Sequence, residues 1–438
     1  MCAPVNCGRA LRPRLEHSWS SRIVIMVQKD SGAYRMTGHL AGLDGVRGLA
    51  ILMVMTNHFV GGATPHTAVQ RLVVKAANYG VLGVDLFFVL SGFLITGLLF
   101  DAKNKPHYFR NFYARRSLRI FPLYYFVLTM LFLLLPNLVT MPEGIQEARR
   151  HQVWLWTYTT NFYIASKSSW GALTYVNHFW SLAIEEHFYL LWPFVVFSFG
   201  RRTLERVCIG VMVGALALRI GLSLAGVSEL SIFVLTPCRV DALCAGGLLA
   251  LRARCKGGAE MLVHHSARSA LVLGSGLVLL SGWCVATNLG IPVFHPVRTS
   301  LYALFFGALL LMSLDARPNL VTMALQSQLL RFFGKYSYGL YVYHGLLTWY
   351  LIDLHAEERC AALVGNHAWA ILITAVVGAG VSVFVAVLSY HLLEKRFLAL
   401  KKFFEARERA PSAQVAMSGR ATSDAKATSA TPRATGEP

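Results

Sequence analysis

The feature of this sequence that most constrains its fold is a series of apolar stretches, each of roughly 20 residues, the length a helix needs to cross a bilayer. Hydrophobic residues make up 55% of the 438 positions and charged residues only 14%. Stretches such as 128–135 and 271–280 show no polar face at helical spacing, which argues against soluble core helices. The sequence therefore predicts an all-α polytopic membrane protein, a bundle of about ten transmembrane helices at 45–62, 79–100, 119–136, 178–199, 207–225, 231–251, 269–287, 298–314, 336–353 and 368–391.

The basic residues indicate how these helices are oriented. The net charge of +19 is spread along the chain and not gathered on one domain, so no nucleic-acid partner is expected. If the amino terminus is cytosolic, 30 of the 41 Lys and Arg residues fall in cytosolic segments and six in outside segments. Because basic residues concentrate on the cytosolic side of membrane proteins, both termini are predicted to be cytosolic.

Composition also divides the chain into three parts. Residues 1–40 are basic and polar and form a predicted cytosolic leader, or an over-extended start with Met26 or Met36 as the true first residue. Residues 41–398 form the membrane domain, and residues 399–438 are predicted to be a disordered cytosolic tail because their composition cannot bury enough surface to order them. The eight cysteines contain no CxxC pair, so neither a metal site nor a disulfide framework is predicted.

Ionisable residues inside apolar spans are costly, which makes them candidates for function. In the first span Arg47 and His58 are 11 residues apart, three helical turns plus about 20°, so they share one face at an axial separation of about 16 Å. The alternative is a snorkelling arginine and an unrelated histidine hydrogen-bonded within the bundle. These two interpretations are equally consistent with the span taken alone.

The fourth predicted span carries a polar stripe formed by His178, Ser181 and Glu185. A carboxylate two turns below the outer surface can orient an imidazole and stabilise its charged form, as in acid–base pairs. The alternative is a glutamate paired with an arginine for packing, which Glu186 on another face fits better.

Further candidates come from other spans. Asp85, near the outer end of the second span, is a second carboxylate candidate, whereas the Ser91-Gly92 pair is better explained by close helix packing. Arg116 and Arg119 lie one turn apart at the cytosolic edge of the third span, where they suit phosphate oxygens or simply follow the orientation signal. Ser337, Tyr341 and His344 align on one face of the ninth span, and this face should line a cavity. The aromatic residues in the loop 137–177 suit an interfacial belt or a carbohydrate platform.

Together these residues resemble the acyltransferase type 3 family, bacterial membrane O-acyltransferases that modify surface polysaccharides, peptidoglycan, nodulation factors and macrolides. The resemblance covers about residues 41–398. It rests on the Arg47/His58 spacing, the segment GVDLFFVLSGF at 83–93, Arg116 and Arg119 followed by Pro122, WSLAIEEHFY at 180–189, RVDA at 239–242 and YSYGLYVYH at 336–344.

The resemblance implies that Arg47 and His58 are an essential pair, that Arg116 and Arg119 serve acyl-CoA binding, and that Glu185 belongs to the site. Arg47 lies at the same cytosolic side as Arg116 and Arg119, so all three arginines are predicted to bind the CoA phosphates. The expected activity is transfer of an acyl group from cytosolic acyl-CoA to a hydroxyl of an extracytoplasmic or lipid-linked carbohydrate or other secreted acceptor, in a bacterial plasma (inner) membrane. Acetyl is the expected acyl group, and acetyl-CoA the expected donor. His58 would act as general base, with Glu185 or Asp85 orienting it. Acyl-CoA is a substrate here, and no permanently bound cofactor is expected.

Two features depart from the family pattern. His187 stands where the family usually has Gln. The carboxy-terminal esterase-like domain that some relatives carry is not expected here, because the tail is too short and too polar. A polytopic transporter or flippase of a glycan or small molecule is the alternative function, since Arg, His and Glu inside a membrane also build substrate and proton paths.

Overall fold

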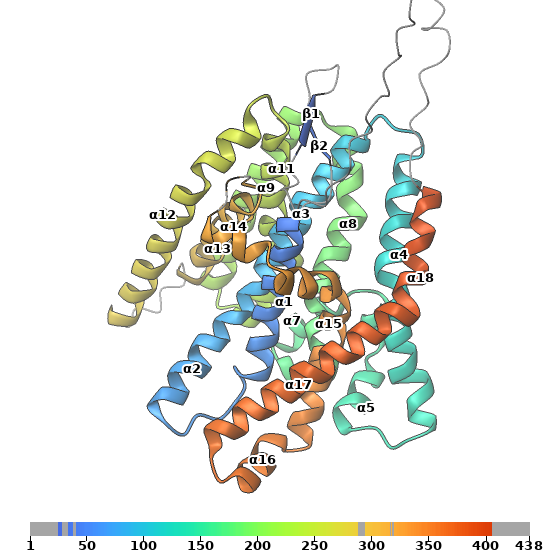
Figure 1. Ribbon diagram of the computed structural model, residues 1–438, viewed down its shortest axis with the longest axis vertical. Coiled ribbons are helices and arrows are strands. Elements are labelled where there is room, and N and C mark those ends of the chain that lie inside the picture. The colour runs from blue at the N-terminus through green and yellow to red at the C-terminus, as the bar shows by residue number, and fades with distance from the viewer. Residues whose placement is uncertain are drawn as a thin grey trace, which may run out of the picture.

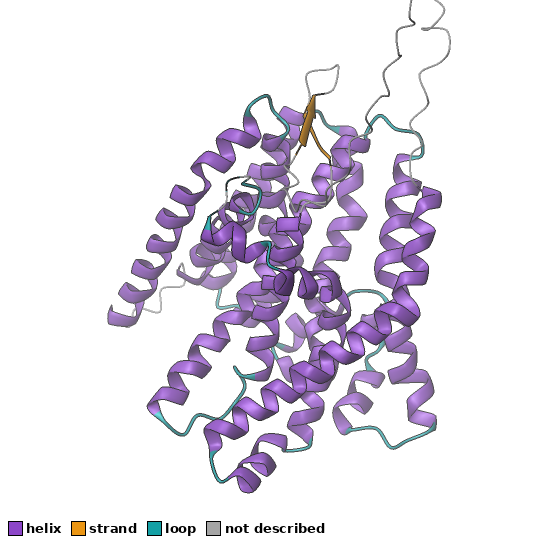
Figure 2. Cartoon of the chain, viewed as in Figure 1, coloured by secondary structure: helices purple, strands orange, loops and turns teal. Residues whose placement is uncertain are grey.

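The computed structural model of this protein describes residues 25–28, 34–37, 41–287, 294–315, 317 and 319–404. Apart from one short antiparallel hairpin, its regular elements are helices (Figure 1, Figure 2). The hairpin joins β1 (Ile25–Gln28) to β2 (Tyr34–Thr37) with Ile25 opposite Thr37. The remainder of the predicted leader, and the predicted tail from residue 405 onward, lie outside the described residues.

Ten helices of 14 or more residues make up the body of the described chain, and each predicted apolar stretch overlaps one of them. In Figure 1, α1 and α3 lie near the centre of the bundle, α12 at one edge and α4 at the other. The ten are α1 (Ala41–Phe59), α3 (Gly83–Ala102), α4 (Tyr108–Thr129), α8 (Trp180–Ser198), α9 (Arg201–Leu224), α11 (Val240–Ala253), α12 (Gly258–Thr287), α13 (Phe294–Met312), α15 (Gln328–Asp353) and α17 (His367–Ser389).

Shorter elements connect or extend these helices. They are α2 (Ala68–Asn78), η1 (Tyr79–Leu82), the π-helix η2 (Met130–Leu134), η3 (Leu135–Asn137), α5 (Glu143–Arg150), α6 (Val153–Trp156), α7 (Thr160–Lys167), η4 (Trp170–Phe179), α10 (Glu229–Val234), η5 (Thr236–Cys238), α14 (Leu320–Leu325), α16 (Ala356–Val364), the π-helix η6 (Tyr390–Glu394), α18 (Lys395–Ala399) and η7 (Leu400–Phe404). The last of these packs against α4, so the first residues of the predicted tail are helical.

Large apolar side chains are exposed along the outer helices. On α12, Leu271, Val278 and Leu279 expose 70 to 72% of their surface, and Phe384 on α17 exposes 68%. Exposed apolar area on this scale is not tolerated in water, so these faces contact lipid. Five helical segments of the described chain are also long and apolar enough to cross a bilayer: Ala68–Ala102, Tyr108–Asn137, Arg201–Leu224, Phe294–Met312 and His367–Phe404. The protein is therefore a helical membrane protein.

Glycine allows α1 and α15 to approach closely along their length. A side chain at Gly48 would overlap the carbonyl oxygen of Leu330, and one at Gly334 would overlap that of Asp44. The two backbones therefore touch near the start of α1. Because α1 continues along α15 from this contact, the last turn of α1, with His58, meets the later part of α15.

The predicted helix at 231–251 is interrupted. The chain instead forms α10, the short η5 and then α11, with Leu235 in an extended conformation between α10 and η5. Pro237 explains the break, because proline has no amide hydrogen to donate to the carbonyl one turn earlier and its ring clashes with that carbonyl in a continuous helix. This break places Arg239 at the amino-terminal end of α11, facing α3.

The segment 137–177 is more structured than a loop, since it folds into η3, α5, α6, α7 and η4. Several of its aromatic residues pack inward: Tyr158, Tyr163 and Tyr175 are buried, and the Tyr175 hydroxyl donates to Asp353 Oδ2 at 2.5 Å. Phe162 and Trp170 are exposed and Trp154 and Trp156 are half-buried, so these four remain available to the predicted belt or carbohydrate platform.

Candidate functional site

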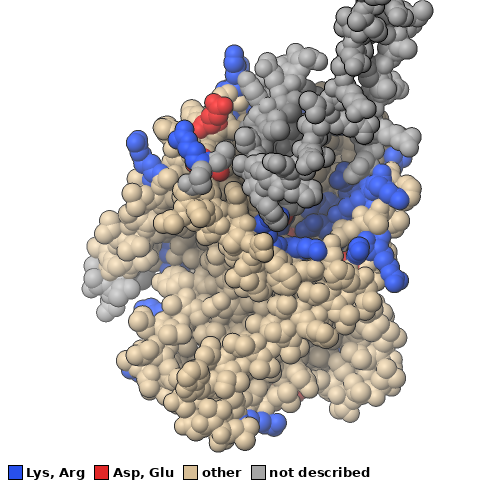
Figure 3. Space-filling model, in the orientation of Figure 1, with Lys and Arg blue, Asp and Glu red and all other residues tan. Residues whose placement is uncertain are grey.

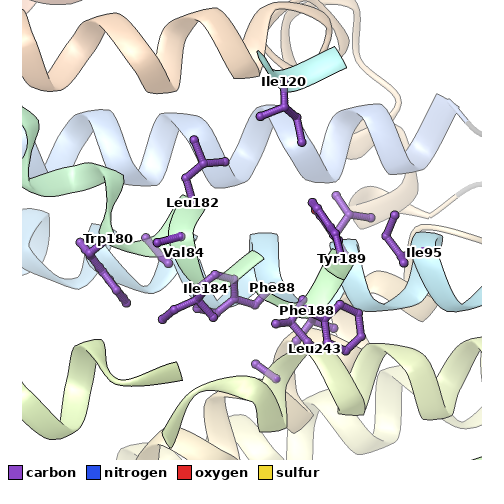
Figure 4. Packing of buried hydrophobic residues seen from close by; sticks show 14 of the residues in the cluster. Val84, Phe88, Ile95, Ile120, Trp180, Leu182, Ile184, Phe188, Tyr189 and Leu243 are labelled. Carbon is purple, nitrogen blue, oxygen red and sulfur yellow. The ribbon is translucent and has the colours of Figure 1, made fainter. Parts of the chain in front are cut away.

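The described residues surround an internal cavity, here called the chamber, between α1, α3, α4, α8 and α15. Its apolar wall includes Phe88, Ile120, Leu182 and Tyr189, which Figure 4 shows within the packed interior. Its polar wall combines three guanidinium groups, one carboxylate and several hydroxyls, supplied by Arg47, Arg116, Arg119, Glu185, Ser91, Ser181, Ser337, Tyr189, Tyr338 and Tyr341.

A second cavity, here called the vestibule, adjoins the chamber. The two share the side chains of Arg47, Leu94 and Arg116. In the vestibule wall, Arg254 donates to both carboxylate oxygens of Asp101, at 2.9 and 2.7 Å, so the one acidic group of this wall is paired. The wall has more basic than acidic side chains, with Arg47, Lys105, Arg115, Arg116 and Arg254 against Asp101.

Arg47, Arg116 and Arg119, the three arginines predicted to bind the donor, meet at the chamber. Arg47 donates to Asp44 Oδ1 at 2.7 Å, one turn earlier on α1. The Arg116 guanidinium lies over the ring of Tyr189, 5.1 Å from its centre. Arg119 lines the chamber one turn further along α4. Arg116 and Arg119 on α4 lie 69 and 72 positions after Arg47 on α1 in the sequence. Cations from two distant segments thus face the same chamber.

Glu185 also lines the chamber, and its hydrogen-bond partner is a hydroxyl. Ser91 donates to Glu185 Oε1, and Tyr189 donates to Ser91 Oγ at 3.2 Å. The carboxylate therefore lies with the arginines at the chamber wall, and the structure does not place it against His58. Ser181, one turn earlier on α8, lines the same chamber. His178, the third residue of the predicted stripe, lies in η4 and does not line the chamber.

Asp85 occupies a different environment. Its Oδ1 accepts from Arg239 Nη2 at 2.7 Å, and both side chains are only 2% exposed. The Arg239 guanidinium also lies 4.6 Å from the ring centre of Phe233. A neighbouring pair, Arg219 and Asp241, is similarly buried at 2.7 Å. Asp85 thus joins α3 to α11, and among the described residues it makes no contact with His58.

The side chain bonded to His58 is another histidine. His58 Nδ1 lies 2.7 Å from His344 Nε2, and the two ring centres are 4.7 Å apart. A third imidazole, that of His178, packs edge-on against His344 with ring centres 5.3 Å apart. His178 Nε2 lies 3.3 Å from the carbonyl oxygen of Val342, to which it donates.

The two polar stripes predicted on α8 and α15 face each other. Ser181 Oγ and the Tyr341 hydroxyl are 2.6 Å apart, and Tyr341 also donates to the backbone carbonyl of His178. Because a phenol has one proton, Ser181 is the donor to Tyr341. The ring of Tyr341 is 5.7 Å from that of His344, so the histidine cluster lies next to the Ser181 end of the chamber.

Sequence reasoning gave no site role to Ser91, Ser181, Tyr341 or His344, although polar spacing on otherwise apolar spans marked the last three. His187, the departure from the family pattern, is bonded to Thr236 Oγ1 at 2.8 Å through Nδ1 and stacks on Phe162. It therefore contacts the interrupted segment between α10 and α11, and not the chamber.

Comparison with known proteins shows which family this chain belongs to. An acyltransferase domain, the one that defines the family named above, matches residues 40–391, most of the chain. The chain belongs to the acyltransferase type 3 family. The Arg47/His58 pair, the arginines of α4 and the stripes of α8 and α15 all lie within the matched residues.

Curated members of the acyltransferase type 3 family resemble this chain at moderate identity. The O-acetyltransferase OatA of Staphylococcus aureus is 27% identical over 321 residues, covering 70% of this chain and 50% of the relative. The peptidoglycan O-acetyltransferase OatA of Listeria monocytogenes is 25% identical, with 70% and 49% covered. A putative peptidoglycan O-acetyltransferase, YrhL of Bacillus subtilis, is 27% identical over 384 residues, with 83% and 56% covered. The chain spans about half the length of these relatives, and no solved structure matches it.

Proposed function

We propose that this protein is a membrane O-acyltransferase that moves an acetyl group from acyl-CoA at the cytosolic face to a hydroxyl of a carbohydrate on the other side. The observation that carries this proposal is the pair of adjoining cavities. They meet at Arg47 and Arg116, and the inner one reaches Ser181 and Tyr341, beside His58 and His344.

The basic side of this path suits a phosphorylated donor. Guanidinium groups bind phosphate oxygens with two parallel hydrogen bonds, and the vestibule and chamber together present Arg47, Arg116 and Arg119. Arg47 and His58 share a face of α1 about 16 Å apart along its axis. That distance is comparable to the length of a pantetheine arm, so phosphates bound near the arginines would leave the thioester near the histidines.

The proposed reaction is direct transfer. His58 removes the proton of the acceptor hydroxyl, the oxygen attacks the thioester carbonyl, the carbon–sulfur bond breaks, and CoA leaves as a thiolate that takes up a proton. A route through an acyl-histidine ranks second. Acetyl as the acyl group and a peptidoglycan-type glycan as the acceptor are supported by the names of the relatives.

The assay for this function measures both products of transfer. In liposomes containing the purified protein, acetyl-CoA with a labelled acetyl group and peptidoglycan oligosaccharide should yield free CoA thiol and an acetyl ester on the glycan in equal amounts. The alternative, a transporter or flippase, predicts movement of unmodified glycan without acyl-CoA. Glycan movement with no ester formed would refute the transferase.

The orientation in the membrane is part of the proposal. Ten spans with both termini cytosolic in a bacterial plasma membrane are supported by the distribution of Lys and Arg, which gather in the upper half of the face shown in Figure 3. Reporter fusions after residues 75, 165 and 290 should therefore report the outside. A cytosolic signal at any of the three would require a different map.

A further inference from the structure

A hydrogen-bond chain runs from His58 to the backbone of α15. His58 Nδ1 is 2.7 Å from His344 Nε2, and His344 Nδ1 is 2.9 Å from the carbonyl oxygen of Leu340, one turn earlier on the same helix. His344 is fully buried. The contact pairs residues 286 positions apart on two helices whose glycines let their backbones touch.

The backbone carbonyl at the end of this hydrogen-bond chain determines which ring nitrogen of each histidine carries a hydrogen. A carbonyl oxygen can only accept, so His344 Nδ1 carries a hydrogen. A neutral imidazole with a hydrogen on Nδ1 has a lone pair on Nε2, so His344 Nε2 accepts from His58. His58 Nδ1 is therefore the donor, and the lone pair of His58 lies on Nε2, the ring nitrogen directed away from His344.

We propose that His344 is a positioning residue, which holds His58 in the tautomer and ring orientation of a general base. This inference rests on the proposed function. As His58 Nε2 takes the acceptor proton, the resulting imidazolium keeps its Nδ1–H bond to the His344 lone pair, which stabilises the new charge. A carboxylate usually has this role, but the carboxylates of Glu185 and Asp85 bond to Ser91 and Arg239.

The surroundings keep His344 in place. His178 packs against it, and Gly345 leaves the space that the His178 ring fills, since a side chain at this position would overlap that ring. Thr348 Oγ1 donates to the His344 carbonyl at 2.8 Å. These contacts fix the backbone and ring of His344 without using its Nε2.

The test uses two nearly isosteric variants. The amide oxygen of His344→Gln can accept from His58 Nδ1, whereas the thioether of His344→Met is a poor acceptor. We expect His344→Met to lower kcat by about 100-fold or more and His344→Gln to retain kcat within about 10-fold, with the KM for acetyl-CoA within about 2-fold in both. In a His58→Ala background, His344→Met should cause no further loss.

The matched control is Tyr343→Phe, which removes the hydrogen bond from the Tyr343 hydroxyl on the same helix to Ser389 Oγ and should leave kcat unchanged. Equal losses in the Gln and Met variants, or a rise in KM in place of a fall in kcat, would overturn the role of His344. Full activity of His344→Met beside an inactive His58→Ala would overturn it as well, and would leave the proposed function standing. An active His58→Ala, in contrast, would count against the proposed function itself.

Discussion

Replacing His58 with alanine is expected to abolish acyl transfer while leaving acetyl-CoA binding nearly unchanged. The imidazole lies at the Ser181 end of the chamber, about 16 Å along α1 from Arg47, so its loss removes proton transfer and not phosphate contacts. General-base catalysis contributes about 10²- to 10⁴-fold in rate. The fall in kcat should be of that size, measured as CoA thiol released, beside a donor dissociation constant obtained by equilibrium binding in detergent.

Arg116→Ala is the matched variant at the other end of the site. Loss of a charge-assisted contact of about 1.5 to 3 kcal/mol should weaken acetyl-CoA binding by about 10- to 150-fold. Arg119→Ala should behave in the same way. If His58→Ala lost donor binding as severely as Arg116→Ala, the separation of the site into a donor end and an acceptor end would be wrong.

Replacing Asp85 with alanine is expected to destabilise the protein strongly. The change leaves the Arg239 guanidinium, 2% exposed, without its carboxylate between α3 and α11. Breaking a buried ion pair by removing one partner costs about 3 to 5 kcal/mol. The expected result is a lower thermal unfolding midpoint in detergent and less protein in the membrane.

Removing both charges provides the control for this prediction. Apolar residues of similar volume often replace a buried ion pair without loss of stability, so Asp85→Leu combined with Arg239→Met should recover most of the unfolding midpoint. A catalytic Asp85, the second carboxylate suggested by the sequence, predicts a different outcome. In that case Asp85→Ala would be inactive at an unchanged midpoint.

The helices of this protein could be predicted from sequence because apolar length and the absence of polar faces are local properties. Each predicted stretch overlaps a helix, and the break at 231–251 follows from Pro237, which is visible in the sequence. The folding of 137–177 into packed helices was not predicted, because its aromatic residues are buried by contacts with distant residues such as Asp353. Local periodicity contains no information on such partners.

The candidate site, like the fold, could be predicted from the sequence only in part. Helical spacing placed Ser181 with Glu185 and Tyr341 with His344, and those stripes do line or adjoin one chamber. Which stripe faces which helix depends on packing between segments far apart in the chain. The pairings of His58 with His344 and of Asp85 with Arg239 therefore required the structure. A carboxylate was the expected partner of His58 because carboxylates orient most catalytic imidazoles.

The side chains where the vestibule meets the chamber also affect whether ions can leak across the membrane through this protein. In the proposed orientation, the polar path begins at the cytosolic face and extends toward the outer side, and such a path could let ions leak down the gradients of the cell. At this junction, however, the path passes Arg47 and Arg116, with Arg119 close behind on the chamber wall. Fixed positive charge along a path opposes the passage of protons and metal cations. The guanidinium groups proposed to bind an anionic donor would thus also keep the membrane electrically sealed while the site is empty.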